Sequence, residues 1–195
     1  ASDDLRVIYL QGIIAEGHGN LTLATSHYRS VIQQWPDHTD SLQKLAKLHF
    51  QLGEMSRAIE YLEQLSALHP GNATYRKQLG AAQLAAGRLD NAFAELSDLG
   101  VDINEQTDAN LLALLGAAHT KQGKLTNGLE SLQRAHELAP DSNPITVQLA
   151  LGHLRSNDVE KAKSLLTQLL VEKPDHLTAQ VLLILAHTQN EPEKA

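Results

Sequence analysis

Histidine is the one residue type with acid–base and metal-binding chemistry that this sequence holds in surplus, with ten copies. Four of them, His49, His119, His153 and His187, are separated by 70, 34 and 34 residues, so the first gap is about twice the other two. Zinc ligands must all lie about 2 Å from one ion, whereas equivalent residues of stacked helices lie on the order of 10 Å apart. Neighbouring histidines of this ladder therefore cannot share an ion without other ligands. We interpret them as half-buried, neutral imidazoles, and we expect their protonation in acid to loosen the structure.

Three short motifs resemble sites for nucleotides or metals, and each lacks a required residue. Residues 17–22 begin like a dinucleotide-binding loop but lack its last glycine and follow a predicted helix instead of a strand. Residues 123–126 resemble the end of a phosphate-binding loop without its first glycine or its final Ser or Thr. His136 is followed by Glu137, but Pro140 stands where a metalloprotease helix needs its second histidine. The sequence therefore predicts no catalytic, cofactor-binding or metal-binding residues and no enzymatic activity.

The composition favours helices and argues against several classes of partner. Of the 195 residues, 42% are hydrophobic but only 4% are aromatic, so Leu and Ala, both strong helix formers, must fill the core. A net charge of −7 without a basic block argues against nucleic acid as a partner. No apolar run reaches the ~20 residues of a membrane span, which argues against direct membrane insertion. The absence of cysteine excludes disulfides but leaves the compartment unknown, since bacterial cytoplasm and periplasm both suit such a chain.

Small residues and prolines recur along the chain with one common period. The spacing from Pro36 to Pro70 is the same as the spacing from Pro140 to Pro174. Alignment on these prolines shows three positions that hold small residues in every copy. The first position holds Gly12, Ala46, Gly80, Gly116 and Ala150, the second holds Gly19, Gly53, Gly87, Gly123 and Asn157, and the third holds Ala24, Ala58, Ala92, Gly128 and Ala162. The chain is therefore an array of repeats.

Each copy is predicted to contain two helices. Apolar residues recur at helical spacing in both halves of a copy, and the second helix of copy two is expected from Met55 to Leu68. Glycine at the second shared position would end the first helix in the left-handed conformation, and proline would close the second helix. Small residues at the other two positions would let the two helices approach closely.

These positions resemble the tetratricopeptide repeat (TPR), a unit of about 34 residues with small residues at its eighth and twentieth positions, a Gly between its helices and a terminal Pro. The resemblance implies an all-α fold, a right-handed α-solenoid of stacked antiparallel helix pairs. It covers a single array over residues 1–195, with the repeats 5–38, 39–72, 73–106, 109–142 and 143–176 and a partial sixth repeat, 177–195. Gly128 departs from the family's usual Ala, and glycine weakens a helix interior by about 1 kcal/mol.

The third and fourth repeats are separated by two inserted residues. Gly100 is expected to stop the preceding helix, and Thr107 or Asp108 to cap the next one. The insertion predicts either a slightly longer loop or a hinge over residues 100–108, between an N-terminal and a C-terminal half.

In the TPR family, the first helices of the repeats line a concave groove, so the resemblance assigns the candidate partner-binding residues. They are Tyr9, Ile13, Gln43, Lys47, Phe50, Lys77, Leu84, Ala113, Ala117, Val147, Leu151 and Leu154. The lining is mixed polar in the first half of the chain and small and apolar in the second. The residues by which some TPR domains clamp the C-termini of chaperones have no match here, so a chaperone tail is not expected as the partner.

The leading hypothesis is a non-catalytic protein–protein interaction scaffold that binds a peptide segment or a partner protein in this groove. The alternatives are a substrate-recruiting TPR region of a larger enzyme, such as a glycosyltransferase, and a part of a bacterial secretion or polysaccharide-export assembly. The helix predicted over 177–187 would leave apolar residues uncovered, so two copies could form a homodimer through it. Because the sixth repeat would stop near the start of its second helix, we also expect the sequence to be a fragment of a longer array.

Overall fold

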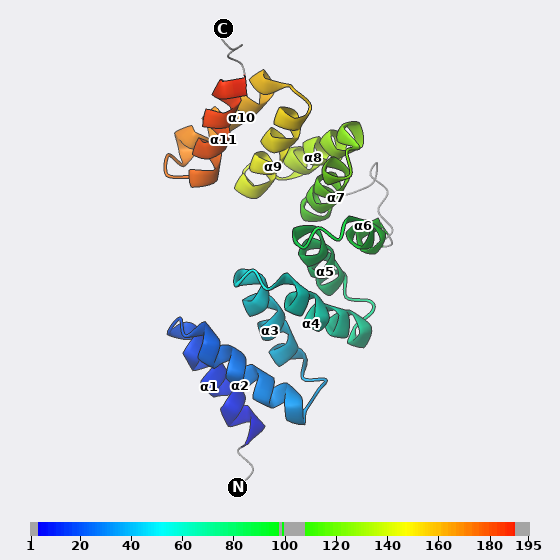
Figure 1. Cartoon of the computed structure of the whole chain (residues 1–195), viewed down its shortest axis with the longest axis vertical. Helices are drawn as coiled ribbons and strands as arrows, with labels where there is room; N and C mark the ends of the chain where they lie inside the picture. Colours follow the sequence, from blue (N-terminus) through cyan, green and yellow to red (C-terminus); the bar gives the residue numbers. More distant parts are fainter. Residues whose placement is uncertain (1–3, 98, 100–107, 190–195) are drawn as a thin grey trace. The chain divides into compact units, whose positions relative to one another are not determined.

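The computed structural model describes residues 4–97, 99 and 108–189, which form eleven helices (Figure 1). They divide into two compact units, Ala1–Glu95 and Leu96–Ala195. Unit 1 contains α1 (Leu5–Gly17), α2 (Leu21–Gln34), α3 (Thr39–Gln51), α4 (Met55–Leu68) and α5 (Ala73–Ala85), and α6 (Leu89–Ser97) crosses the boundary. Unit 2 contains α7 (Ala109–Lys121), α8 (Leu125–Leu138), α9 (Asn143–Arg155), α10 (Val159–Glu172) and α11 (Leu177–Gln189).

The all-α prediction is confirmed, and so is the arrangement of the helices in adjacent pairs. Within unit 1, α1, α2, α3 and α4 each pack on the next helix along the chain, and within unit 2 the same holds for α7, α8, α9 and α10. Helix α4 spans the predicted range, Met55 to Leu68, while α11 continues two residues beyond the predicted His187. That the two units form one array, with a hinge over 100–108, stays a prediction, because Gly100 and residues 101–107 lie outside the described residues.

The first helix of each pair ends as its glycine predicts. Gly19, Gly53, Gly87 and Gly123 have φ angles between 74° and 80°, and Asn157 takes the same place with φ 63°. In this left-handed region of positive φ, residues other than Gly and Asn are strained. The backbone N–H of the following residue then turns back onto the helix, as Glu54 N does on the carbonyl of His49 at 2.8 Å. The chain thereby enters the second helix within three residues.

The first helices also begin at side chains that cap them. The Asn72 and Asp108 side chains accept hydrogen bonds from the backbone N–H groups of α5 and α7, which confirms Asp108 as the predicted N-cap. At the same repeat position, His38 and His176 cap α3 and α11 through Nδ1, which accepts from Ser41 N and Ala179 N at 3.2 Å. Polar side chains thus cap the starts of α3, α5, α7 and α11, whereas the Ser142 side chain makes no capping hydrogen bond to α9.

Close helix crossings explain two of the three small-residue positions. A Cβ at Gly12 would lie 2.6 Å from the ring of Tyr28, and one at Gly116 would lie 2.6 Å from Leu132 Cγ. A Cβ at Gly128 would collide with Thr120 Oγ1 and lie 3.0 Å from the carbonyl oxygen of Gly116. The glycine at 128 is therefore required by the packing of α7 on α8, although the family pattern favours Ala there.

Candidate functional site

The predicted groove residues differ in how much surface they offer. In unit 1, Ile13, Gln43, Lys47 and Phe50 are exposed and Tyr9 and Lys77 are half-buried; in unit 2, Ala117, Val147 and Leu151 are half-buried. The remaining three are buried with 5% of their surface exposed: Leu84, Ala113 and Leu154. These three pack inside their units and leave a partner little surface to contact.

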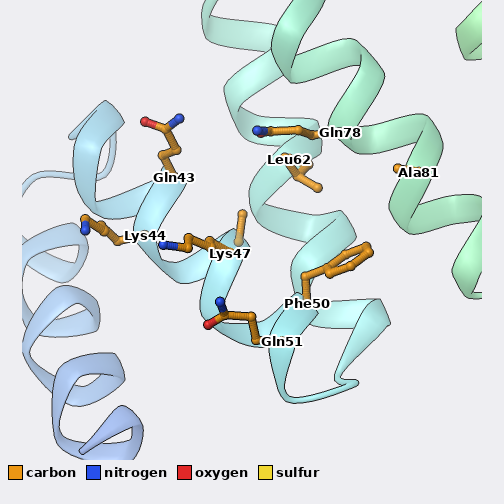
Figure 2. A pocket seen from close by; sticks show the side chains of 9 residues that line it. Gln43, Lys44, Lys47, Phe50, Gln51, Leu62, Gln78 and Ala81 are labelled. Carbon is orange, nitrogen blue, oxygen red and sulfur yellow. The ribbon is translucent and has the colours of Figure 1, made fainter. Parts of the chain in front are cut away.

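Unit 1 has an open cavity of about 550 Å³ between α3, α4 and α5 (Figure 2). Three of the predicted residues, Gln43, Lys47 and Phe50, lie together on its α3 side. The rest of the lining comes from α3, α4 and α5 and consists of Lys44, Ala46, Gln51, Leu62, Gln78 and Ala81. Within unit 1, the structure therefore brings part of the predicted groove together in one concave site.

Six lining residues are absent from the predicted set: Lys44, Ala46, Gln51, Leu62, Gln78 and Ala81. Lys44 and Gln78 hold the sixth position of their repeats, next to the fifth position from which Gln43 was chosen. That adjacency is a signal in the sequence that could have found them. Leu62 lies on a second helix and Ala46 is only 3% exposed, so both looked like core residues, and only the shape of the cavity shows that they form part of its wall.

Glu16 of α1 holds both lysines of the cavity. Its Oε2 accepts hydrogen bonds from Lys44 Nζ and Tyr28 Oη, each at 2.9 Å, and its Oε1 lies 3.6 Å from Lys47 Nζ. Burial alone would raise the pKa of Glu16, but the hydrogen bonds from Lys44 and Tyr28 outweigh it and hold the pKa below its usual range. Glu16 is therefore ionised at neutral pH and fixes Lys44 at the edge of the cavity.

Four aromatic rings continue this network away from the cavity. Tyr28 packs on Tyr9 with ring centroids 5.6 Å apart, Tyr9 meets the edge of His38 at 5.2 Å, and His38 meets Trp35 at 4.8 Å. Burial raises the pKa of Tyr28, and its hydrogen bond to Glu16 adds to the effect, so Tyr28 remains a neutral donor. The rings make α1, α2 and the start of α3 one rigid support for Glu16.

Unit 2 has a smaller pocket at the equivalent place, with a volume of about 170 Å³. It lies between α7 and α9, with Leu132 of α8 in the position that Leu62 has in unit 1. Of the predicted residues, Ala117 and Leu151 line it. Thr120, Lys121, Gln148, Gly152 and Arg155 complete the lining. The apolar second half of the predicted groove thus forms a shallow depression.

The histidine ladder is structural in three of its four members. His49, His119 and His153 are buried and not half-buried as expected, with 1%, 8% and 8% of their surface exposed. His187, in contrast, is exposed, so the expectation that it is half-buried is wrong, because no described helix packs on that face of α11. His49 Nδ1 lies 2.6 Å from Glu54 Oε2, and its ring stacks on Tyr61 with centroids 5.6 Å apart.

The part of the chain that the structure describes contains neither a metal-binding cluster nor a membrane-spanning helix. Within residues 4–97, 99 and 108–189, no three His, Cys, Asp or Glu side chains are grouped so that they could hold a metal ion. Among the helices formed by these residues, none is long and apolar enough to cross a membrane.

Consecutive helix pairs, each with a left-handed residue between its helices, define an α-helical repeat protein. The tetratricopeptide repeat family model matches residues 15–77, and the chain has the fold of solved TPR structures. The thermophilic TPR protein TTC0263 of Thermus thermophilus is 21% identical, with a TM-score of 0.74 over 95% of this chain and 100% of that chain.

Curated relatives match at similar identity but are much longer. BBSome complex member BBS4 of Bos taurus is 25% identical over 172 residues, which cover 88% of this chain and 33% of that protein. The CTR9 homolog of Arabidopsis thaliana is 25% identical over 119 residues, which cover 60% of this chain and 11% of that protein. The chain therefore spans a third or less of the length of these relatives.

Proposed function

We propose that the chain is a non-catalytic protein–protein interaction module that binds a peptide segment of a partner protein on its first helices, and that the cavity of unit 1 is the main contact. The observation that carries this proposal is the cavity itself: an open space of about 550 Å³ whose lining joins apolar and polar side chains. Ligand sites of proteins have volumes in this range, with mostly apolar walls and a few polar groups.

The two kinds of lining suit the two parts of a peptide. Phe50 keeps 40% of its surface exposed, and with Leu62 and Ala81 it offers an apolar wall to a side chain. Gln43 and Gln78 are exposed on α3 and α5, on either side of the cavity (Figure 2). Their amide groups can both donate to and accept from a peptide backbone. A segment that places one apolar side chain in the cavity would therefore also satisfy its backbone at the rim.

The names of the relatives agree with this proposal. BBS4 is named as a member of the BBSome complex. The alternatives named from the sequence, a recruiting region of a larger enzyme or of an export assembly, would use the same binding surface.

The proposal can be tested with a phage-displayed library of random dodecapeptides selected on the immobilised chain. We expect selected peptides to lose binding to the Ala81→Leu variant, because the added side chain fills the cavity. Ala73→Leu is the matched control, since Ala73 lies exposed on the same helix outside the cavity lining. Peptides that bind the wild type and both variants equally would contradict the proposal.

A second copy of the chain is a further candidate partner, as the sequence predicts. Leu177, Val181 and Ile184 of α11 are 74%, 63% and 65% exposed. Helix α11 holds no Asp, Glu, Lys or Arg, so two such helices can meet without repulsion between like charges. We propose that the chain self-associates through this helix at high concentration.

A further inference from the structure

The charges around the cavity of unit 1 have one sign. Of its nine lining residues, only Lys44 and Lys47 are ionised, and both are cations. The nearest carboxylate that binds them is Glu16, outside the lining. Glu16 holds Lys44 by a hydrogen bond but lies 3.6 Å from Lys47, so Lys47 is the less tightly held of the two ammonium groups at this edge of the cavity.

The two lysines are held differently. Lys44 donates a hydrogen bond of 2.9 Å to Glu16, and 32% of its side chain is exposed. Lys47 lies 3.6 Å from the other oxygen of Glu16, which is an ion-pair distance longer than a hydrogen bond, and 58% of its side chain is exposed. Lys47 is therefore the cation that a ligand can reach, while Glu16 and Lys44 form a fixed pair beside it.

The cationic and apolar parts of the lining lie on opposite sides. Figure 2 shows the side chains of Lys44 and Lys47 directed to one side of α3, toward α1, and the ring of Phe50 directed to the other, toward α5. Ala81 faces that ring from α5 (Figure 2). A ligand that fills the cavity would thus contact apolar groups near α5 and a positive charge near α1.

From this arrangement we propose that the cavity of unit 1 selects a segment in which a bulky apolar side chain stands beside a carboxylate. The apolar side chain fills the space between Phe50, Leu62 and Ala81, and the carboxylate pairs with Lys47. Glu16 is a positioning residue: it neutralises Lys44 and sets the charge of the rim to that of a single cation. The inference rests on the proposed function and adds the chemistry of the partner segment.

Unit 2 is a natural contrast within the same chain. At the ninth repeat position, unit 2 has Ala117 and Leu151 where unit 1 has Lys47 and Ala81. The exchange removes the reachable cation of α3 and places a larger side chain in the apolar space. The lining of the unit 2 pocket still holds two cations, Lys121 and Arg155, so the two units differ in the size of the apolar space and not in the sign of the charge.

Three small probes with the same apolar group and different charges test the proposal: phenylbutyrate, phenylbutyramide and phenylbutylamine. Each is titrated at pH 7 and low salt into the whole chain carrying ¹³C-labelled Ala and Leu methyl groups, and the shifts of the Leu62 and Ala81 methyls are followed by NMR. We expect phenylbutyrate to bind about two- to fivefold more tightly than the amide, as for a partly exposed ion pair, and the amine most weakly. High salt should reduce the difference.

Substitutions of Lys47 and Glu16 should change the preference for phenylbutyrate over phenylbutyramide in opposite directions. Lys47→Gln should bring the affinities for phenylbutyrate and phenylbutyramide together, whereas Glu16→Gln should increase the preference for phenylbutyrate because it frees a second positive charge. Melting temperatures of both variants show whether the network around Tyr28 is intact. Lys121→Gln, in the pocket of unit 2, is the matched control and should change neither affinity.

The outcomes separate this inference from the proposed function. Equal binding of phenylbutyrate and phenylbutyramide, abolished for both by Ala81→Leu, would overturn the selection of a carboxylate and leave the cavity as an apolar binding site. A preference for phenylbutyrate that survives Lys47→Gln would overturn the role of Lys47. If no probe shifts the Leu62 and Ala81 methyls, the cavity binds no such ligand, and the proposed function fails at this site as well.

Discussion

The two units form a pocket at the same place in their repeats, yet the pocket of unit 1 has about 550 Å³ and that of unit 2 about 170 Å³. Both lie between successive first helices, with a leucine of the second helix, Leu62 or Leu132, in the wall. The side chains at the ninth repeat position differ: Ala81 leaves space in unit 1, and Leu151 occupies it in unit 2. The same arrangement of helices can therefore form a larger or a smaller cavity, depending on a few side chains.

Packing of the helices contributes to the same difference. In unit 2, α7 contacts α9 directly as well as α8. A Cβ at Gly152 of α9 would lie 3.0 Å from Leu129 Cδ2, so the glycine lets α9 pack close on α8. Close packing of these three helices leaves less room for a cavity in unit 2.

The largest effect is expected on the free energy of unfolding, from Gly128→Ala in the closely packed helices of unit 2. The new Cβ meets Thr120 Oγ1 and the backbone of α7, so the free energy of unfolding should fall by about 1–3 kcal/mol, as for other overpacked cores. Chemical denaturation followed by circular dichroism measures this change.

Two further substitutions serve as controls for Gly128→Ala. Gly17→Ala adds the same atom where nothing lies within 4 Å and should be nearly neutral. In the Gly128→Ala background, Thr120→Ala should cost less than it does alone, because it removes the oxygen that the new methyl group meets. If Gly128→Ala instead stabilises the chain, as its helix propensity alone would suggest, the close packing described for α7 and α8 is wrong.

The second prediction exchanges the ninth-position residues of the two units. Ala81→Leu should lower the affinity of a selected peptide at least about tenfold, which is about 1.4 kcal/mol. Leu151→Ala should enlarge the pocket of unit 2 and leave that affinity unchanged. Isothermal titration calorimetry measures both. A peptide that loses affinity with Leu151→Ala and keeps it with Ala81→Leu would reverse the roles of the units.

Leu151 is also a better site for testing unit 2 than Leu154. Both were predicted to line the groove, but Leu154 is 5% exposed, and a glutamate there would bury an unpaired charge. Leu151 is half-buried and lines the pocket, so its substitution changes the surface with less risk to the fold.

The third prediction concerns acid, which should weaken unit 2 before unit 1. Burial lowers the pKa of His119, and Lys124 adds to the effect; burial also lowers the pKa of His153, against the opposing charge of Asp158. A histidine with a lowered pKa in the folded state binds its proton more readily when unfolded. Its stabilising contribution is therefore complete above the unfolded value of about 6.5 and is lost as the pH falls below it.

In unit 1, the group whose lowered pKa couples stability to pH is Glu16, and its contribution is lost at lower pH than that of the histidines. The pKa of Glu16 is lowered, so its contribution is lost only as the pH falls below the usual glutamate value of about 4.5. Between pH 7.5 and pH 5 we expect the melting temperature seen by circular dichroism to fall, by less than in Gly128→Ala. Trp35, the only tryptophan, reports on unit 1, and its fluorescence transition should move less. An unchanged melting temperature, or a larger shift at Trp35, would contradict this prediction.

The smallest effect is expected at the exposed face of α11. Val181→Glu together with Ile184→Glu should remove self-association without unfolding, because both side chains are more than 60% exposed. Sedimentation velocity of the wild type should show a dimer at high concentration, and the double variant should sediment as a monomer. A wild type that is monomeric throughout would exclude the interface, and an unchanged dimer in the variant would move it elsewhere.

The sequence predicts the helices of this chain better than its binding surface. The recurring glycines and Asn157 mark where first helices end, and Met55 to Leu68 is a helix as expected, because these signals act over a few residues. Burial depends instead on neighbours that the repeat pattern does not distinguish. Leu84 and Leu154 hold groove positions but are buried, while Leu62, on a second helix, lines the cavity.

Gly128 shows a second limit of pattern-based prediction. The low helix propensity of glycine suggests that position 128 destabilises its helix. The position nevertheless requires glycine, because a Cβ there would collide with Thr120 on the preceding helix. The network of Glu16 with Tyr28, Lys44 and Lys47 likewise joins residues from three helices. Each of these residues is unremarkable in the sequence, and only their geometry gives the cavity its charge.

The central claim is that unit 1, through its cavity, holds the ligand. The most direct test is a methyl NMR titration of the whole chain with the tightest peptide from the library selection. The account predicts shifts at Ala46, Leu62 and Ala81, which line the cavity, and none at Ala117, Leu132 and Leu151, which line the pocket of unit 2. Shifts confined to the second set of methyl groups would contradict it.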